Sequence, residues 1–192
     1  MEPAPRVELD ELLAAEYEYI TQTAGQANED RARVASFYLV AVGSLVAALF
    51  GTQFSNEETY TQTVKIMFSG LFVLLTLLGV STVMQLARLR GAWYEAMQAL
   101  NQIKDFAVQQ SPELKQAFRW TSETLPPKYK IGSVSHYQAS EVSLIGGLMF
   151  GAAVFFLQQA FLPLTFFTWL LAALAGSLVV FLQLQLYKRI LR

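Results

Sequence analysis

Six basic residues precede or follow the long uncharged stretches of this chain, four of them within three residues of a stretch, and their side chains suit the binding of an anion. Arginine donates two parallel hydrogen bonds to a phosphate, whereas lysine acts as a point charge. If the stretches cross a membrane, these residues form a basic ring at its edge, where lipid headgroups or an anionic signalling molecule would bind. The simpler alternative is an ion pair between Glu29 and Arg33, four residues apart, together with membrane anchoring. The six residues are Arg31, Arg33, Arg88, Arg90, Lys128 and Lys130.

The other polar residues give little support for catalysis. The chain has no cysteine, which excludes disulfides, thiolate nucleophiles and cysteine-bound metals. Its one histidine, His136, is expected in a polar loop, and there is no glycine-rich phosphate loop or GxSxG sequence. The acidic residues lack the spacing of metal ligands. We therefore expect no enzyme activity, no catalytic residue, no metal and no cofactor, and the net charge of −1 predicts no direct binding of nucleic acid.

Four uncharged stretches determine the expected fold class. A helix of about 20 apolar residues crosses the hydrocarbon core of a bilayer, and its backbone groups must be paired within the helix. Only 15% of the residues are charged and 54% are hydrophobic, as in an integral membrane protein. We predict an all-α protein with four transmembrane helices embedded in a lipid bilayer. The predicted spans are residues 34–51, 66–87, 142–162 and 166–187.

The distribution of lysine and arginine predicts the orientation, because short cytoplasmic loops collect basic residues. One orientation places 13 of the 14 basic residues on one side of the membrane. Both termini, the segment 88–141 and the tail 188–192 are then cytoplasmic. Residues 52–65 form an outer loop, and residues 163–165 form an outer turn. The first residues have neither the basic start nor the early apolar run of a signal peptide, so we expect the first span to be retained.

The first two spans are expected to continue into the cytoplasm as a helical stalk. Apolar residues recur at alternating spacings of four and three on both sides, as in a coiled-coil seam. Residues 1–33 carry eight acidic and three basic residues, and 88–141 carries seven basic and five acidic ones, so the two segments attract each other. The alternative is an amphipathic helix that lies on the membrane surface. The seam residues are Leu13, Tyr17, Ile20, Ala24 and Ala27, and Leu89, Trp93, Ala96, Leu100, Ile103 and Ala107.

The remainder of segment 88–141 is predicted to hold a short helix followed by a linker. Ser111, Pro112 and Glu113 combine a capping hydroxyl, a proline at the first helical position and an acid in the first turn. Pro126 and Pro127 would end this helix. Residues 128–140 are then expected as a polar linker to the third span.

Small residues on the spans predict where helices approach closely. Gly147 and Gly151 form a GxxxG pair in the third span, and Gly176 follows Ala172 at the same spacing in the fourth. Packing within one subunit and packing between subunits remain equal alternatives for these positions. The spans contain no ionisable residue, which argues against a proton-coupled transporter. The helix-packing or oligomer residues are Gly43, Ala47, Gly51, Gly147, Gly151 and Gly176.

Scattered residues over most of the chain resemble small bacterial membrane proteins with four spans. They are the run 16–20, the run 29–33 leading into Phe37, Tyr38 and Leu39, and Trp93, Met97, Ile103, Lys104, Leu114, Ala117, Trp120 and Pro126. The pattern is similar to the RipA-like family of oligomeric inner-membrane proteins, and to the SLATT-type and related four-span effectors of anti-phage defence. This resemblance implies a homo-oligomer in the bacterial inner membrane. The defence class further implies a pore or a membrane-disrupting effector, held closed until a partner or a nucleotide-like signal acts on the cytoplasmic part.

Two hypotheses for the function follow from the sequence. The first is a homo-oligomeric inner-membrane effector that forms or gates a pore, is regulated through its cytoplasmic helices, and acts in anti-phage defence as the resemblance implies. The second is a structural membrane subunit that does not conduct and whose stalk recruits a cytosolic partner protein. Ion or dye flux through liposomes separates the two.

Overall fold

The computed structural model describes residues 9–53 and 61–192. Within these ranges the chain is helical and contains no β-strand, which confirms the all-α class. Each of the four α-helices is long and apolar enough to cross a membrane. Residues 1–8 of the predicted acidic segment and residues 54–60 of the predicted outer loop lie outside the described residues. The elements are α1 (Leu9–Gln53), α2 (Gln62–Gln110), the 3-10 helix η1 (Pro112–Gln116), α3 (Val134–Phe161) and α4 (Phe166–Ile190).

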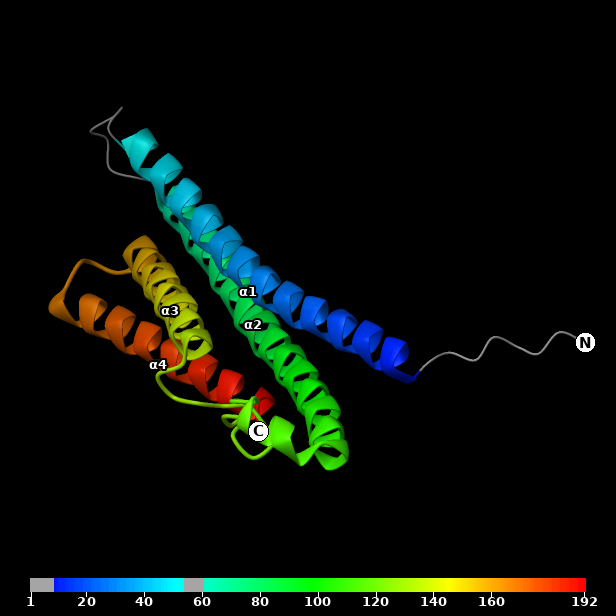
Figure 1. Cartoon of the computed structure of the whole chain (residues 1–192). Helices are drawn as coiled ribbons and strands as arrows, with labels where there is room; N and C mark the ends of the chain where they lie inside the picture. The colour runs from blue at the N-terminus through cyan, green and yellow to red at the C-terminus, as the bar shows by residue number, and fades with distance from the viewer. Residues whose placement is uncertain (1–8, 54–60) are drawn as a thin grey trace, which may run out of the picture.

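The central helix of the fold is α2. It packs against α1, α3 and α4, whereas α1 has almost all of its tertiary contacts with α2 (Figure 1). Tyr38 of α1 is 2% exposed and lies against Gly79 of α2, where a Cβ would come within 2.7 Å of the tyrosine hydroxyl. The main core continues from there through Leu86 of α2 and Val142 of α3 to Tyr187 of α4.

The stalk consists of residues 9–33 of α1 and residues 88–110 of α2, and each part is continuous with an apolar span. Ile20 and Ala24 of α1 form a small core with Ala96 and Leu100 of α2. The pairing ends before the tip of α1, because Tyr17 is 40% exposed. Figure 1 shows the blue end of α1 running away from the green end of α2. The first helical turns of α1 therefore project without a neighbour among the described residues.

Glycines bring α3 and α4 into backbone contact. A Cβ at Gly147 would lie 2.6 Å from the carbonyl oxygen of Gly176, and a Cβ at Gly151 would lie 3.0 Å from that of Ala172. Thr165 begins α4 with a capping box, in which its side chain and that of Thr168 each accept from the other's backbone N–H. The two helices form an antiparallel pair that covers one side of α2 (Figure 1).

The predicted helix between residues 112 and 125 is wrong beyond its first turns. The 3-10 helix η1 ends at Gln116, and residues 117–133 form turns and irregular structure. Thr121 and Thr124 explain part of the difference, since the Thr121 N–H donates to the Thr124 hydroxyl at 2.8 Å. Such local side-chain bonds compete with the helical backbone pattern.

The predicted linker 128–140 is also wrong in its second half, because α3 begins at Val134. Gly132 has a φ of 77°, a left-handed conformation that glycine adopts without strain and that turns the chain into the helix. Ser133 then caps α3, since its side chain accepts from the N–H of His136. His136 therefore lies in the first turn of α3 and not in a loop. Similarly, α4 continues to Ile190, three residues beyond the predicted span.

Candidate functional site

Two arginines are buried where α1 and α2 leave their apolar stretches. Arg31 of α1 is 8% exposed, and Arg90 of α2 is 7% exposed. Arg31 precedes the uncharged stretch 34–51 by three residues, and Arg90 follows 66–87 by three. Arg31 shares the face of α1 that carries Ala27 and Ala35, both of them buried against α2 or the main core. The helix register therefore turns this guanidinium toward α2 instead of toward solvent.

Neither guanidinium has a counter-charge among the described residues. The only ion pairs there join Arg33 to Asp30 at 3.2 Å and Lys128 to Glu95 at 3.7 Å. Arg31 and Arg90 are close enough to repel each other. A charge that is taken out of water costs several kcal/mol unless an opposite charge and hydrogen bonds compensate for it. Two unpaired cations in one buried place are consequently the most unusual electrostatic feature of the described chain.

Arg90 makes two neutral contacts that position it. Its Nε donates to the carbonyl oxygen of Lys128 at 3.2 Å, and its Cζ lies 4.2 Å from the centre of the Trp93 ring. A cation above an aromatic face is attracted to the ring quadrupole. Lys128 reaches this place because Gly91 has no side chain, and a Cβ there would lie 3.2 Å from Cε of Lys128. Arg31 has no equivalent support, since its Nε is buried without a hydrogen-bond partner.

Polar groups of α3 and α4 complete the surroundings of the two arginines. Tyr187 of α4 is 1% exposed and interacts electrostatically with Arg31 and with Arg90. Its hydroxyl also interacts with the side chain of Ser135 in the first turn of α3. Its ring lies 6.3 Å from that of Tyr129, which precedes α3. We call the group of Arg31, Arg90, Ser135 and Tyr187 the arginine site, and every α-helix contributes one of these residues to it.

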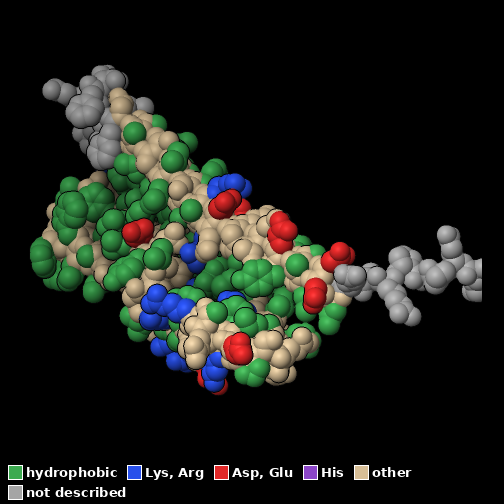
Figure 2. All heavy atoms as spheres, in the orientation of Figure 1, with side chains coloured by type: hydrophobic (Ala, Val, Ile, Leu, Met, Phe, Trp, Pro, Cys, Tyr) green, Lys and Arg blue, Asp and Glu red, His purple; other side chains and the backbone are tan. Residues whose placement is uncertain are grey.

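The structure does not bring the six predicted basic residues into one group. Arg33, Arg88 and Lys130 are exposed. Lys128 is half-buried, and it contributes its backbone carbonyl to Arg90 while its ammonium group pairs with Glu95. Figure 2 shows acidic side chains spaced along the projecting part of α1, and basic side chains, with some acidic ones among them, gathered near the C-terminal end of the chain. Of the six, only Arg31 and Arg90 are buried, whereas Arg33, Arg88 and Lys130 are surface charges.

Ser135 and Tyr187 are parts of the arginine site that sequence reasoning missed. The signal for Ser135 lies in the Gly132–Ser133 helix start, which places residue 135 on the first turn of a helix. Tyr187 is the last residue of the uncharged stretch 142–187, and it lies next to three basic residues of the tail. The Tyr187 hydroxyl is therefore a candidate for a polar contact at the end of a span. Its two arginine neighbours are distant in sequence, so the sequence does not identify them.

No group of three or more His, Asp or Glu side chains that could hold a metal ion occurs in residues 9–53 and 61–192. The His136 ring lies 6.0 Å from the Tyr129 ring, and its Nδ1 is buried without a hydrogen-bond partner. The rings of Tyr129 and Tyr137 are therefore the aromatic neighbours of this imidazole.

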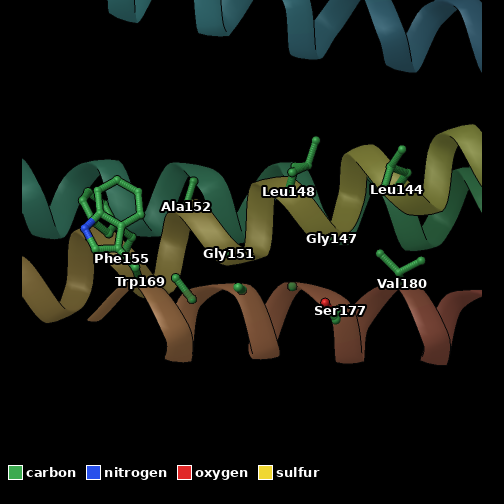
Figure 3. A pocket seen from close by; sticks show the side chains of 12 residues that line it. Leu144, Gly147, Leu148, Gly151, Ala152, Phe155, Trp169, Ser177 and Val180 are labelled. Carbon is green, nitrogen blue, oxygen red and sulfur yellow. The ribbon is translucent and has the colours of Figure 1, made fainter. Parts of the chain in front are cut away.

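The small residues fall into two groups. Gly147, Gly151 and Gly176 lie between α3 and α4 of the same chain. They form the floor of an apolar groove of about 470 Å³, closed at one end by Phe155 and Trp169, whose ring centres are 4.4 Å apart (Figure 3). Gly43, Ala47 and Gly51 of α1 are instead exposed, and no atom of the described residues lies within 4 Å of a Cβ placed at either glycine.

Comparisons with known proteins add no relative, since no family model, no curated protein and no solved structure matches this chain. Interpretation of the site accordingly depends on the geometry and chemistry described above.

Proposed function

We propose that this chain is a subunit of a homo-oligomeric, non-enzymatic membrane protein that forms or gates a pore through the movement of its stalk. Four helices long and apolar enough to span a bilayer make it a multi-pass membrane protein. The proposal places it in the bacterial inner membrane, with both termini and the stalk in the cytoplasm. Anti-phage defence, which the resemblance implies, is the biological setting that we propose for it.

The observation that carries the proposal is the small-residue face of α1, which has no partner in residues 9–53 and 61–192. Gly43, Ala47 and Gly51 are spaced by four residues and are all exposed, while α1 packs almost only against α2. Lipid chains make few van der Waals contacts with a helix face that carries only small residues. Another helix can approach such a face closely and associate with it by van der Waals contact. The α1 helix of a neighbouring subunit fits this face, which would place the α1 helices around the oligomer axis.

The continuity of α1 supports gating through the stalk. One helix of 45 residues, Leu9–Gln53, carries both the cytoplasmic seam around Ala24 and the exposed face around Ala47. A continuous helix can transmit a tilt or rotation from one end to the other. A ligand or partner that changes the pairing of α1 with α2 in the stalk would therefore shift the α1 face at the oligomer axis.

A second candidate function rests on the projecting tip of α1. Leu12 and Tyr19 are 55% and 66% exposed at the acidic end of the helix. A cytosolic partner with a basic, apolar-lined groove would suit this tip, in which case the membrane part is a scaffold that does not conduct.

Dye release from liposomes tests the proposal. Ala24 is 5% exposed in the stalk seam, so Ala24→Asp places a charge between α1 and α2 and opens the stalk. The matched control is Ala14→Asp, at an exposed position of the same helix. We expect the wild-type protein and the control to release dye slowly, and Ala24→Asp to release it at least ten times faster. Release no faster than from empty liposomes for all three proteins would exclude the pore and leave the scaffold.

The oligomer is tested separately from conduction. Gly43→Leu and Ala47→Leu fill the exposed face of α1, whereas Gly70→Leu fills an equally open position on α2, where no atom lies within 4 Å of a Cβ. The mass of the complex in detergent is expected to fall toward the monomer for the two α1 variants only. An unchanged mass in both would remove α1 from the oligomer axis.

A further inference from the structure

We propose that the arginine site binds a phosphate group between Arg31 and Arg90. This proposal does not depend on whether the protein conducts, since it concerns the chemistry of one buried site. It also narrows the predicted ring of six basic residues to the two that are buried and lack a counter-charge.

No negative charge among the described residues compensates for the two buried arginines. Both arginines are more than nine-tenths buried, and neither has a carboxylate partner in the described residues. The carbonyl of Lys128 and the ring of Trp93 hold Arg90, but these are neutral groups. Arg31 lacks even this, because its Nε has no hydrogen-bond partner. A buried charge is stable when an ion of opposite sign and hydrogen bonds compensate for its lost hydration. An anion between the two guanidinium groups would supply both.

The hydrogen-bond donors of the two arginines favour a phosphate over a carboxylate. Two arginine side chains offer many N–H donors, and the buried Tyr187 interacts electrostatically with both. A carboxylate has two oxygens and satisfies a single arginine fork, whereas a phosphate offers additional oxygens and can accept from two forks at once. A phosphate group is thus the better match to this set of donors.

The position of the site at the edge of the predicted bilayer suggests two sources for that phosphate. Arg31 and Arg90 each lie three residues from an uncharged stretch, where the headgroups of a bilayer begin. The phosphate of an anionic lipid reaches this level from the membrane, and a soluble phosphate reaches it from the water. The chemistry of recognition is the same for both sources.

Binding would have a structural consequence. The arginine site takes one residue from each of α1, α2, α3 and α4. A phosphate that neutralises Arg31 and Arg90 removes the repulsion between α1 and α2, so it favours the packed arrangement of the four helices at this end of the spans.

The experiment measures the apparent melting temperature of the delipidated full-length protein in maltoside micelles, which contain no phosphate. One arm adds phosphatidylglycerol, with a phosphate-free galactolipid as its control. The other arm adds inorganic phosphate, with chloride at the same ionic strength as its control. For a ligand at roughly 100 times its Kd, we expect a rise of about 5–10 °C. A rise with phosphatidylglycerol alone identifies a lipid site, one with inorganic phosphate alone identifies a soluble ligand, and either result supports the proposal.

Variants test whether the arginine site is responsible. Arg31→Gln and Arg90→Gln are expected to abolish the rise, and each is expected to melt at a higher temperature than the wild-type protein without ligand, since one of two repelling buried charges is gone. Loss of an arginine with a purely structural role would lower the melting temperature without ligand and would not raise it. Arg33→Gln and Arg88→Gln are matched controls at exposed positions of the same two helices, and they should retain the full rise.

Three outcomes would overturn the proposal. The first is the absence of a rise in both arms, and the second is an equal loss of the rise in the exposed controls. The third comes from Arg31→Lys and Arg90→Lys, which keep the charge and remain informative if a glutamine variant does not fold. Lysine lacks the bidentate fork, so at least half of the rise should disappear. An undiminished rise in both lysine variants would contradict a site built on arginine geometry.

Discussion

Gly147 of α3 and Gly176 of α4 bring the two helix backbones into contact, with the Val180 side chain beside them. A Cβ added to either one would lie 2.6 Å from the carbonyl oxygen of the other. Backbone atoms cannot move aside as a flexible side chain can, so the whole helix pair would have to separate. This contact lies beneath the apolar groove of Figure 3, and it determines how closely α4 approaches the rest of the bundle.

Gly147→Ala is therefore expected to destabilise the protein. Overpacking of a tight contact costs about 1–3 kcal/mol, and separation of α3 from α4 would also remove packing along both helices. The control is Gly70→Ala, at an exposed helical glycine with open space around it, which should stabilise by about 0.5–1 kcal/mol through helix propensity. Unfolding titrations in mixed micelles measure both. Equal effects of the two substitutions would mean that the contact between α3 and α4 does not limit stability.

The stalk seam can be tested by cross-linking, because the chain has no cysteine of its own. Ala24 and Ala96 are both buried in the same small core of the stalk. The double variant Ala24→Cys with Ala96→Cys is expected to form an intramolecular disulfide under mild oxidation in membranes. Tyr19→Cys with Ala96→Cys is the control, since Tyr19 is 66% exposed. Gel mobility before and after reduction reports the cross-link, and equal cross-linking of both pairs would contradict a fixed seam.

The sequence predicted the helices well, because their signals are local. Uncharged stretches of about 20 residues define the spans, and the alternating spacing of Ile20, Ala24 and Ala27 identified a face that the structure buries. These signals fail where local side-chain hydrogen bonds compete with the backbone pattern of a helix. Thr121 and Thr124 form a turn in place of a helix, and the start of α3 at Gly132 and Ser133 was overlooked within a polar segment.

The arginine site was only partly predictable, because its members are distant in sequence. The seam spacing continues from Ala27 by four residues to Arg31, which distinguishes Arg31 from Arg33. No comparable rule could show that the chain returns through Lys128 to Arg90, or that Tyr187 arrives from the other end of the chain. These contacts depend on how the two helix pairs pack. The same packing leaves Arg31 and Arg90 without a carboxylate partner among the described residues.

Gln183 provides a test of polar groups inside the bundle. It is 2% exposed within α4 and lies against Gly146, and neither atom of its amide has a hydrogen-bond partner among the residues that the structure describes. A buried unpaired amide costs about 1–3 kcal/mol, so Gln183→Leu, of similar size, should raise the free energy of unfolding by about 1 kcal/mol or more. Gln185→Leu at an exposed position of α4 is the control. A loss of stability in Gln183→Leu alone would reveal that this amide has a partner, such as water, in the membrane.

The orientation of the chain is tested by labelling single cysteines in intact cells with a membrane-impermeant maleimide. Gln116→Cys lies at the end of η1, and Leu164→Cys lies in the turn between α3 and α4, and both positions are exposed. Most lysines and arginines lie on the side of Gln116, and basic loops stay in the cytoplasm. Leu164→Cys should therefore be labelled in intact cells, whereas Gln116→Cys should be labelled only after lysis. The reverse pattern would put the stalk and the arginine site outside, where neither a cytosolic partner nor an intracellular phosphate could reach them.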